Sequence, residues 1–198
     1  MSSPGKSAVH FLRYLWGWDE PETQTTALEQ QALARHGAGK RRLAEIGVFE
    51  GFTTRRLAEA MAGDGELFAI DPFTPGRFGG CWGRLIARKE VAKVKTVRRV
   101  RFIPKFSHEA AAMIKGDFDF VFLDGDHSLE GIRRDWVDWA GRLGPGGIMA
   151  LHDTRVPAHN PAVATLGSHI FFESDIRRDS RFELVEQVDS LSVLRRRS

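Results

Sequence analysis

Acidic residues and histidines follow two short apolar runs of this chain. Asp124 and His127 belong to the segment D-G-D-H, and His152 and Asp153 come directly after the next apolar run. A histidine, with an ordinary pKa of about 6.5, can take a proton from a substrate at neutral pH. Two carboxylates and an imidazole can also hold Mg²⁺, Mn²⁺ or another divalent ion. We therefore predict His127 as a catalytic base, and Asp124, His152 and Asp153 as metal ligands. Alternatively, His152 and Asp153 only cap a strand end.

A second group of residues forms a glycine turn between an apolar run and a helical segment. Glu45, Gly47 and Gly51 give the spacing E-x-G-x-x-x-G, and Thr53 begins the helical segment. Glycines let a backbone pass close to a ligand, and the free N–H groups of a helix start are hydrogen-bond donors. The turn lacks the G-x-G-x-x-G fingerprint of dinucleotide-binding proteins. Because Glu45 would repel a pyrophosphate, we expect a nucleotide-like ligand that is neutral or cationic at this point.

A further acid stands about twenty residues beyond this turn. Asp71 follows the apolar residues 67–70 and precedes Pro72 and Phe73. In a strand–helix–strand unit, an acid at the end of the second strand accepts hydrogen bonds from ribose hydroxyls. Alternatively, Asp71 caps a turn before Pro72. The acid indicates an adenosine-containing ligand and leaves the reaction open.

The elements that must position these residues alternate along the chain. Strands are predicted at 42–48, 66–71, 98–103, 118–124 and 147–153. Helices are predicted at 26–34, 53–62, 82–92, 107–115, 129–142 and about 162–175, and a turn at 143–147. This alternation predicts an α/β fold with a mostly parallel sheet covered on both faces. Two further segments, 182–188 and 191–195, predict a final antiparallel hairpin and hence seven strands. Residues 10–16 are too mixed in polarity to predict an element.

Length and composition bound the class of protein. A chain of 198 residues fits one domain, which we place at 41–198, preceded by a helical segment at 1–40 that could cap a substrate. The single cysteine, Cys81, excludes an intrachain disulfide and suits a reducing compartment. The start of the chain lacks the apolar core of a signal peptide, and no apolar run is long enough to cross a membrane. We therefore expect a cytoplasmic protein with no membrane partner.

The charge is uneven, although the net charge is only +3. Residues 84–105, the basic stripe, hold nine basic residues and one acid. Such a stripe can bind phosphate, which makes RNA an alternative partner. We favour a solvated helix and strand face, because Phe102 is the one aromatic residue in the stripe that could stack on a base.

Taken in order, these motifs resemble those of the class I S-adenosylmethionine-dependent methyltransferases. The resemblance is to the small O-methyltransferase branch, with D-G-x-H after the fourth strand and H-D after the fifth, and covers about residues 40–197. It implies a doubly wound, Rossmann-like fold. The cofactor-binding residues that it implies are Glu45, Gly47, Gly51, Thr53, Asp71, Pro72, Phe73, Ser107 and Asp124.

The resemblance also implies how these residues would act. Glu45 and the two glycines would line the methionine end of the cofactor, Asp71 would bind the ribose, and Ser107 would lie near the adenine. Relatives that need a metal hold it at the positions of Asp124, His152 and Asp153. This chain has His152 where an acid is usual.

We therefore expect an enzyme that transfers a methyl group from S-adenosylmethionine to a hydroxyl of a small molecule, with His127 as base and with or without a divalent metal. The alternatives are an RNA methyltransferase that uses the basic stripe, and a non-catalytic module that binds S-adenosylmethionine. The missing fingerprint disfavours an NAD-linked dehydrogenase. The loop at 72–83 is either a lid or a surface connection. The sequence leaves the oligomeric state open, a homo-oligomer included.

Overall fold

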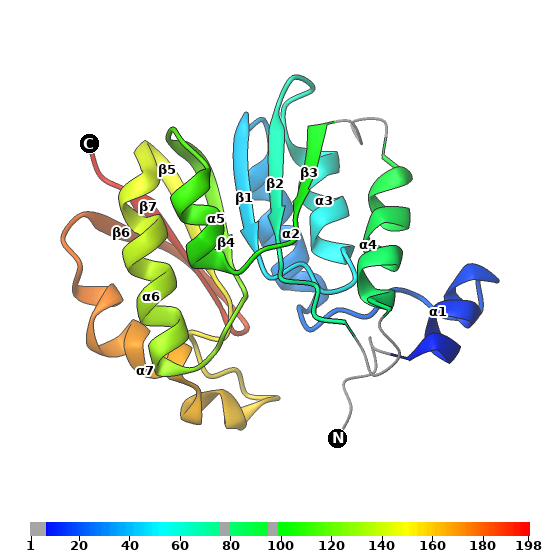
Figure 1. Cartoon of the computed structure of the whole chain (residues 1–198). Coiled ribbons are helices and arrows are strands. Elements are labelled where there is room, and N and C mark those ends of the chain that lie inside the picture. Colours follow the sequence, from blue (N-terminus) through cyan, green and yellow to red (C-terminus); the bar gives the residue numbers. More distant parts are fainter. Residues whose placement is uncertain (1–6, 76–79, 95–98) are drawn as a thin grey trace.

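A computed structural model describes residues 7–75, 80–94 and 99–198 (Figure 1). Its seven strands form one sheet with the order β3-β2-β1-β4-β5-β7-β6. The strands are β1 (Arg42–Ile46), β2 (Glu66–Ile70), β3 (Val100–Ile103), β4 (Phe118–Leu123), β5 (Leu143–Leu151), β6 (Phe182–Val188) and β7 (Leu191–Arg196). The first five run parallel, and β7 pairs antiparallel with both β5 and β6. The predicted mostly parallel, seven-stranded fold with a terminal hairpin is confirmed.

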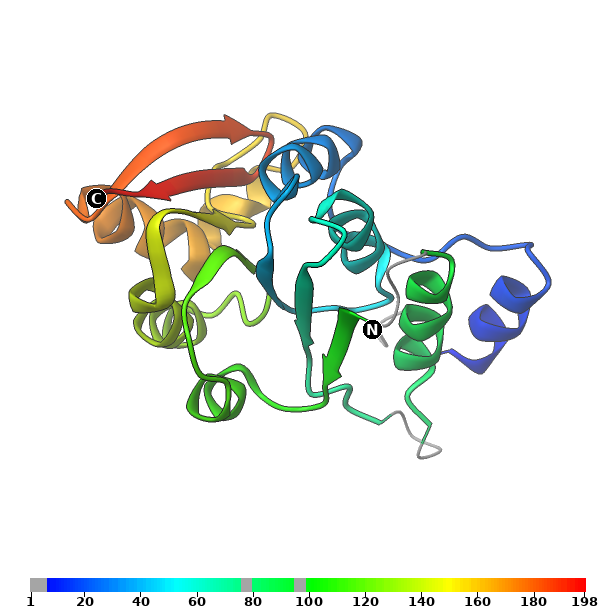
Figure 2. The ribbon, with the colours of Figure 1, turned by 90° about the horizontal axis from the view of Figure 1, so that it is seen from above.

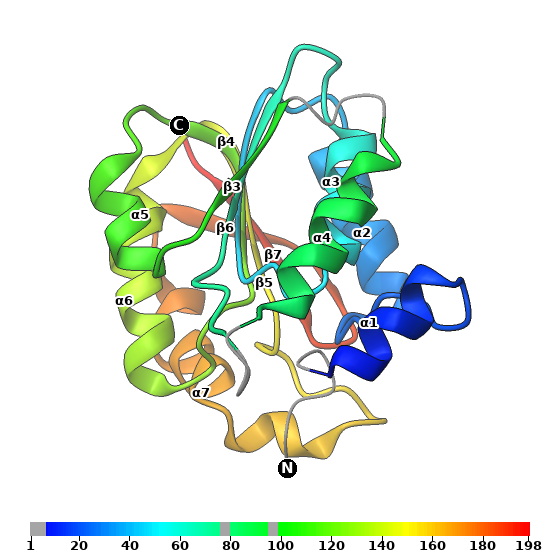
Figure 3. The same ribbon diagram turned by 45° about the vertical axis from the view of Figure 1, so that its right-hand side comes forward.

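Helices cover both faces of this sheet, as Figure 3 shows. The α-helices are α1 (Ala8–Leu15), α2 (Ala27–Gly37), α3 (Phe52–Ala60), α4 (Trp82–Ala92), α5 (Ser107–Met113), α6 (Leu129–Trp139) and α7 (Gly167–Ser174). Helices α2, α3 and α4 lie on one face and α5, α6 and α7 on the other. The hairpin β6–β7 lies at the opposite end of the sheet from β3 (Figure 2).

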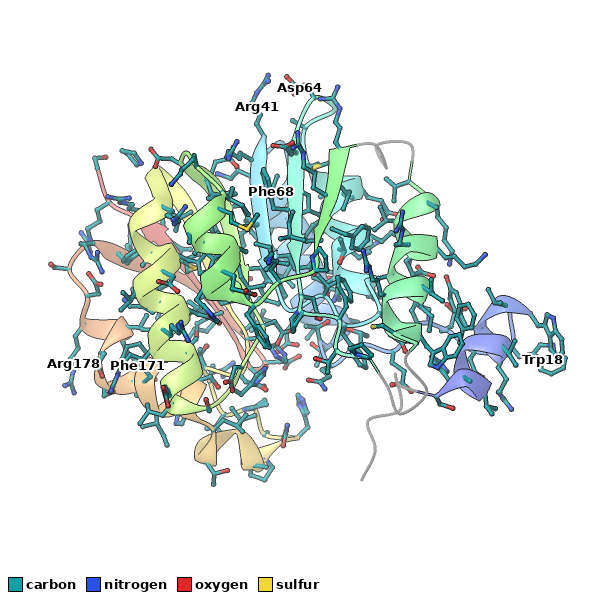
Figure 4. The ribbon with its side chains drawn as sticks, in the orientation of Figure 1. Trp18, Arg41, Asp64, Phe68, Phe171 and Arg178 are labelled. Atoms are coloured by element: carbon teal, nitrogen blue, oxygen red, sulfur yellow. The ribbon has the colours of Figure 1, made fainter. Side chains whose placement is uncertain are left out.

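Alternation along the strands builds a core on each face. Phe120 and Phe122 pack with the α2 and α3 side of the sheet, whereas Val121 and Leu123 pack with α5, α6 and α7. Successive side chains of a strand point to opposite faces, so a strand covered on both sides must be apolar throughout. Phe68 of β2 (Figure 4) belongs to the core on the α5, α6 and α7 face, where its ring meets that of Phe118 edge to face.

Two predicted boundaries were wrong for identifiable reasons. The segment predicted as a turn at 143–147 lies inside β5, which begins at Leu143. Between the pairs Phe118–Leu143 and Phe120–Ile148, β5 advances five residues while β4 advances two, so the glycines form an irregularity within the strand. The helix predicted at about 162–175 is divided into a 3₁₀ turn, η4 (Pro161–Thr165), and α7. A Cβ on Gly167 would lie 2.0 Å from the backbone nitrogen of Leu129, so this glycine allows the start of α7 to pack against the start of α6.

Other boundaries differ less. The mixed segment near residue 10 forms α1, which contacts α4 and lies outside the two layers (Figure 1). Helix α6 ends at Trp139 and continues as a 3₁₀ turn, η3 (Ala140–Arg142). A second such turn, η5 (Ile176–Arg178), precedes β6. Residue 98 of the predicted third strand and residues 76–79 of the predicted lid lie outside the described residues. No helix in the described ranges has the length and apolar character needed to span a membrane.

Candidate active site

A cavity of about 980 Å³ opens where β1, β2 and β4 end. Its walls also include the starts of α3, α5 and α6 and residues 22–24, which precede α2. Open α/β sheets bind ligands at the carboxyl ends of their strands. Arg41 and Asp64, which form an ion pair, mark the opposite end of the sheet (Figure 4). The cavity therefore lies on the side predicted for the ligand.

The two glycines of the turn are required by packing within the protein. Gly47 lines the cavity with a φ of 90°, and a Cβ there would lie 2.0 Å from the carbonyl oxygen of Asp124. Gly51 has a φ of 78° and does not line the cavity. A Cβ on Gly51 would lie 2.6 Å from Cα of Ala87 in α4. Both glycines are therefore required by close approach to β4 or α4, and Gly47 also forms part of the cavity wall.

Glu45 lies beneath the turn and outside the lining of the cavity. Its carboxylate is fully buried, and burial raises its pKa well above the ordinary value, with Asp124 and Asp71 adding to the effect. Thr53 does line the cavity, and its Oγ1 accepts a hydrogen bond from Nε2 of Gln30 at 2.7 Å. Of these two predicted cofactor residues, Thr53 forms part of the cavity wall and Glu45 lies behind it.

Asp71 fixes the backbone of the glycine turn. Its Oδ2 accepts hydrogen bonds from the backbone N–H groups of Val48 at 3.0 Å and Phe49 at 3.2 Å. Its Oδ1 accepts from the N–H of Phe73 at 2.6 Å, so the alternative turn-capping role is present. Asp71 and Pro72 line the cavity, whereas the buried Phe73 ring packs near Phe102 and is not part of the lining. A carboxylate has about four lone-pair sites, so Asp71 can accept further hydrogen bonds from a ligand.

Two histidines and two carboxylates gather where β4 and β5 end, and we call them the His/Asp cluster: Asp124, His127, His152 and Asp153. His152 Nδ1 lies 2.9 Å from Asp124 Oδ1 and 3.7 Å from Asp153 Oδ2. His127 Nδ1 lies 2.9 Å from Asp153 Oδ2, and its Nε2 lies 3.3 Å from Asp124 Oδ1. The side chain of His127 is 23% exposed and that of His152 only 3%. His127 is therefore the histidine that faces the cavity.

Backbone pairing holds this cluster together. The N–H of His152 donates to the carbonyl of Leu123 at 3.0 Å, which continues the β4–β5 ladder by one step. Ser168, at the start of α7, donates its Oγ–H to the carbonyl of Asp153 at 2.8 Å and its N–H to the carbonyl of His127 at 3.3 Å. The convergence expected from neighbouring parallel strands is thus observed, and α7 supports it from outside.

The donor atoms of the cluster suit a divalent cation. Asp124, His127 and His152 each offer a ligand atom, and these atoms lie within 4.8 Å of one another. Asp124 Oδ1 and His152 Nδ1 are both buried and lie 2.9 Å apart, close enough to pair with each other. A divalent cation would replace this direct contact once His152 has lost its proton. The structure therefore joins Asp124 and His152 as predicted and adds His127, while Asp153 contacts His127.

Residues 44–154, more than half of the chain, match the sequence profile of a family described as a methyltransferase domain. The chain belongs to this methyltransferase family.

Two curated proteins share part of this methyltransferase sequence. One, the uncharacterized protein y4gI of Sinorhizobium fredii, is 30% identical over 129 residues, which are 63% of this chain and 14% of that protein. The other, Tricin synthase 1 of Oryza sativa subsp. japonica, is 34% identical over 121 residues, which are 58% of this chain and 45% of that protein. The matched part thus spans less than half of either relative.

Solved methyltransferase structures share the fold. An O-methyltransferase from Bacillus cereus in complex with S-adenosylhomocysteine has a TM-score of 0.65 at 17% identity, covering 94% of this chain and 89% of that one. TomG, an O-methyltransferase from Streptomyces achromogenes in complex with S-adenosylmethionine, has the same TM-score and identity and covers 100% and 92%. At this identity the likeness shows a common class I methyltransferase fold.

The charges of the His/Asp cluster shift its pKa values strongly. The carboxylates of Asp124 and Asp153 raise the pKa of His127 to about 9, against the opposing effect of burial. Burial lowers the pKa of His152, but Asp124 and Glu29 outweigh it and raise the value to about 11. Burial likewise raises the pKa of Asp124, and the two histidines reverse this and bring it below the ordinary value. At neutral pH these shifts favour the protonated, positively charged imidazole of both histidines.

Glu29 of α2 is a site residue that the sequence analysis missed. It is fully buried, and its Oε2 lies 3.5 Å from His152 Nε2. The N–H and Oγ–H of Ser190 donate to Oε1 at 2.8 and 2.7 Å, and the N–H of Thr26 donates to Oε2 at 2.7 Å. The T-x-x-E spacing of Thr26 and Glu29 identifies a helix-capping pair. Nothing in that local pattern indicates the contact with His152, which follows 123 residues later.

The remaining predictions fall on the other walls. Ser107, predicted to lie near the adenine, lines the cavity at the start of α5. Asp135 of α6 also lines the cavity and was missed, because an acid in an amphipathic helix is ordinarily read as part of its solvated face.

In the basic stripe, Lys93 pairs with Glu90, and Arg101 with Glu66. These acids offset part of the charge that would attract RNA.

Proposed function

We propose that this methyltransferase transfers the methyl group of S-adenosylmethionine to a hydroxyl of a small molecule. One observation carries the proposal: a single cavity is lined by the glycine turn, by Asp71 and by the exposed side of the His/Asp cluster. The first two features suit a methyl donor that contains adenosine, and the third suits an acceptor that must lose a proton.

The charge of the cavity suits this donor. The acids among its lining residues are Glu22, Asp71, Asp124, Asp126, Glu130, Asp135 and Asp153, against Arg134 and two histidines. S-adenosylmethionine carries a positive sulfonium and an ammonium group. An acidic cavity attracts such a ligand and repels the pyrophosphate of NAD. Asp71, with lone pairs left after its three backbone contacts, would accept hydrogen bonds from the ribose hydroxyls.

The reaction transfers one methyl group and one proton. The acceptor oxygen forms a bond to the methyl carbon while the carbon–sulfur bond breaks, and its electron pair stays on sulfur as the neutral thioether of S-adenosylhomocysteine. The hydroxyl proton passes to Nε2 of His127, whose 3.3 Å contact with Asp124 is longer than the 2.9 Å contact of Nδ1 with Asp153. Asp153 would then orient the imidazole, as a carboxylate does for other histidine bases.

A divalent cation such as Mg²⁺ fits beside this base. Asp124 and His152 would hold it in place of their direct 2.9 Å contact, once His152 has lost its proton, and Asp153 would be the third ligand. Such an ion acidifies a bound hydroxyl and so assists its deprotonation. If Nε2 of His127 were itself bound to the metal, it could not accept the proton of the substrate hydroxyl. The roles of base and of metal ligand can therefore be separated by experiment.

Part of the N-terminal segment forms a wall of the cavity. Residues 22–24 line the cavity, and the N–H of Glu22 donates to the buried carboxylate of Glu50 at 2.7 Å. We propose that residues 1–40 serve as a cap over the acceptor, which suits a small molecule better than a folded RNA.

Calorimetric titration of the full chain with S-adenosylhomocysteine, NAD and Mg²⁺ tests the donor. We expect S-adenosylhomocysteine to bind and NAD to fail. Methyl transfer from S-adenosylmethionine is then measured on a panel of small phenols, catechols and sugars and on total RNA. Binding of NAD alone would contradict the proposal. Binding of S-adenosylhomocysteine without turnover on any acceptor would favour a non-catalytic module, and salt-sensitive methylation of RNA would favour the basic stripe.

A further inference from the structure

Asp153 has a backbone conformation that residues other than glycine seldom adopt. Its φ is 52°, in the left-handed region, where a residue with a side chain is strained. Such strain persists only where the surrounding structure holds it, and it gathers at functional sites. Asp153 is also the residue whose Oδ2 lies 2.9 Å from Nδ1 of His127. The strained backbone therefore belongs to the carboxylate that faces the proposed base.

Ser168 holds this strained backbone from outside the site. It lies in the first turn of α7, is 2% exposed, and donates its hydroxyl proton to the carbonyl of Asp153 at 2.8 Å. One Cα carries both the carbonyl and the side chain of Asp153, so fixing the carbonyl limits where the carboxylate can lie. Because a buried carbonyl that loses its donor is costly, removal of this hydroxyl would favour a different backbone conformation.

The same serine also holds the segment that carries the base. The N–H of Ser168 donates to the carbonyl of His127 at 3.3 Å. Gly167 allows this close approach, because a Cβ there would lie 2.0 Å from the backbone nitrogen of Leu129. Ser168 thus ties the segment after β4, which carries the proposed base, to the segment after β5, which carries the carboxylate that orients it.

We infer that Ser168 is a positioning residue for methyl transfer, whose hydroxyl keeps Asp153 in the conformation that orients His127 toward the acceptor. The inference rests on the proposed function, because it takes His127 as the base. An imidazole whose carboxylate partner moves can turn away from the substrate hydroxyl, and a displacement of about 1 Å can cost about 100-fold in rate. Ser168 does not line the cavity, so its effect should fall on turnover and not on ligand binding.

Steady-state kinetics of Ser168→Ala test the inference. The kcat should fall by about 10- to 100-fold, the usual effect of losing a supporting hydrogen bond behind a reacting group. The KM for the acceptor and the affinity for S-adenosylhomocysteine should stay close to wild type. Ser168→Cys, which keeps a similar shape but offers a weaker donor, should lose kcat in the same direction.

Ser174→Ala is the matched control. Ser174 lies in the same helix, and its hydroxyl also donates to a backbone carbonyl, that of Ile170 at 3.0 Å. It is exposed and lies outside the cavity lining, so its kcat should match wild type.

Proton NMR gives a second measure that needs no turnover. A proton on Nδ1 of His127 that is shared with the nearby Asp153 carboxylate should give a downfield resonance, assigned by its absence in His127→Ala. The resonance should be present in wild type and in Ser174→Ala, and lost or broadened in Ser168→Ala.

The outcomes separate the inference from the function on which it rests. Wild-type kcat in both Ser168 variants, or an unchanged resonance in Ser168→Ala, overturns the inference. A parallel loss of kcat, acceptor affinity and S-adenosylhomocysteine affinity makes Ser168 a general support for α7 and also overturns it. If Ser168→Ala fails to fold, Ser168→Cys decides the outcome. Absence of turnover in wild type overturns the proposed function, and the NMR comparison then still decides whether Ser168 positions Asp153 against His127.

Discussion

Both ring nitrogens of His127 face carboxylates, and this arrangement sets the pH at which it can act. Asp124 and Asp153 favour the protonated imidazole and raise its pKa to about 9. A general base works only after it has lost its proton. Without added metal, turnover should therefore rise with pH up to about 9, and not level off above the ordinary histidine value of about 6.5. NMR of the labelled imidazole should show the same midpoint.

His127→Ala tests the base directly. Turnover should fall by about 10²–10⁴-fold, the usual contribution of general base catalysis, and the alkaline rise should disappear. The affinity for S-adenosylhomocysteine should stay close to wild type, since the imidazole touches the acceptor and not the adenosine. His159→Ala serves as the control histidine, because its residue lies outside the cavity lining. Full activity of His127→Ala would place the base elsewhere.

Measurements of metal affinity distinguish the metal ligands of the His/Asp cluster from the catalytic base. Asp124→Asn, His152→Ala and Asp153→Asn should each weaken Mn²⁺ binding by about tenfold or more, and added Mg²⁺ should partly restore the activity of Asp153→Asn. His127→Ala should leave Mn²⁺ affinity nearly unchanged if His127 is the base. Calorimetry or electron paramagnetic resonance measures the ion without a need for turnover. A clear loss of Mn²⁺ affinity in His127→Ala would instead assign His127 to the ligand set, as the proximity of its nitrogen to Asp124 and His152 allows.

At the level of elements, Glu29 links α2 to the strands that carry the site. It accepts hydrogen bonds from Ser190, in the β6–β7 turn, and faces His152 after β5. Glu29→Gln should lower the free energy of unfolding by about 1–3 kcal/mol at pH 7, because a buried network loses its charged acceptor. Urea titration measures this loss. Glu109→Gln is the control, since Glu109 also caps the start of its helix but is far more exposed.

The pH dependence of this loss follows from the direction of the Glu29 pKa. Burial raises this pKa, but His152, Ser190 and Thr26 outweigh it and bring the value to about 2. A carboxyl whose folded pKa is depressed stabilises the protein above its unfolded pKa, and that stability declines as pH falls toward the folded value. The difference between wild type and Glu29→Gln should therefore be largest above about pH 4.5 and shrink as the pH falls toward 2. A difference that is constant across this range would contradict the ionised role of Glu29.

The sequence predicted those elements and site residues whose signals are local. Alternation of apolar runs with helical segments indicated the sheet, and D-G-D-H and H-D could be joined because parallel strands end at one edge. Glu29 and Asp135 could not be found this way, since each reads locally as an ordinary helix residue. The β5 irregularity and the break before α7 depend on pairing with β4 and on packing against α6, which a local pattern does not contain.

At the scale of the whole molecule, α1 and the segment after it are attached to the domain through buried charges. Glu50 is fully buried, and its Oε2 accepts from the N–H of Glu22 at 2.7 Å and lies 3.0 Å from His10 Nε2. Tyr14 of α1 donates to the buried Glu90 of α4 at 2.6 Å. Trp18, beyond these contacts, points away from the body of the molecule (Figure 4). The segment that lines the cavity is thus attached through a few polar contacts, together with the buried Tyr14 and the stacking of Phe11 on Trp82.

Glu50→Gln should loosen this segment while the sheet stays intact. The amide keeps the size of the side chain but loses the charge that holds His10 and the N–H of Glu22. Hydrogen exchange should therefore become faster at residues 16–24 and stay unchanged in β4 and β5, since local opening depends on local contacts. If these residues cap the acceptor, its KM should rise about tenfold, whereas affinity for S-adenosylhomocysteine should change little.

Glu173→Gln is the control for this change, because Glu173 of α7 pairs with Arg177 of η5, outside the cavity lining. His10 adds a pH dependence of known sign. Although burial lowers its pKa, Glu50 and Asp19 raise it above the ordinary value, so the charged link to Glu50 weakens as pH rises through that raised pKa. The protection of residues 16–24, corrected for intrinsic exchange, should fall over the same range in wild type and not in Glu50→Gln. Faster exchange with an unchanged acceptor KM would show that the segment is attached as described but does not cap the acceptor.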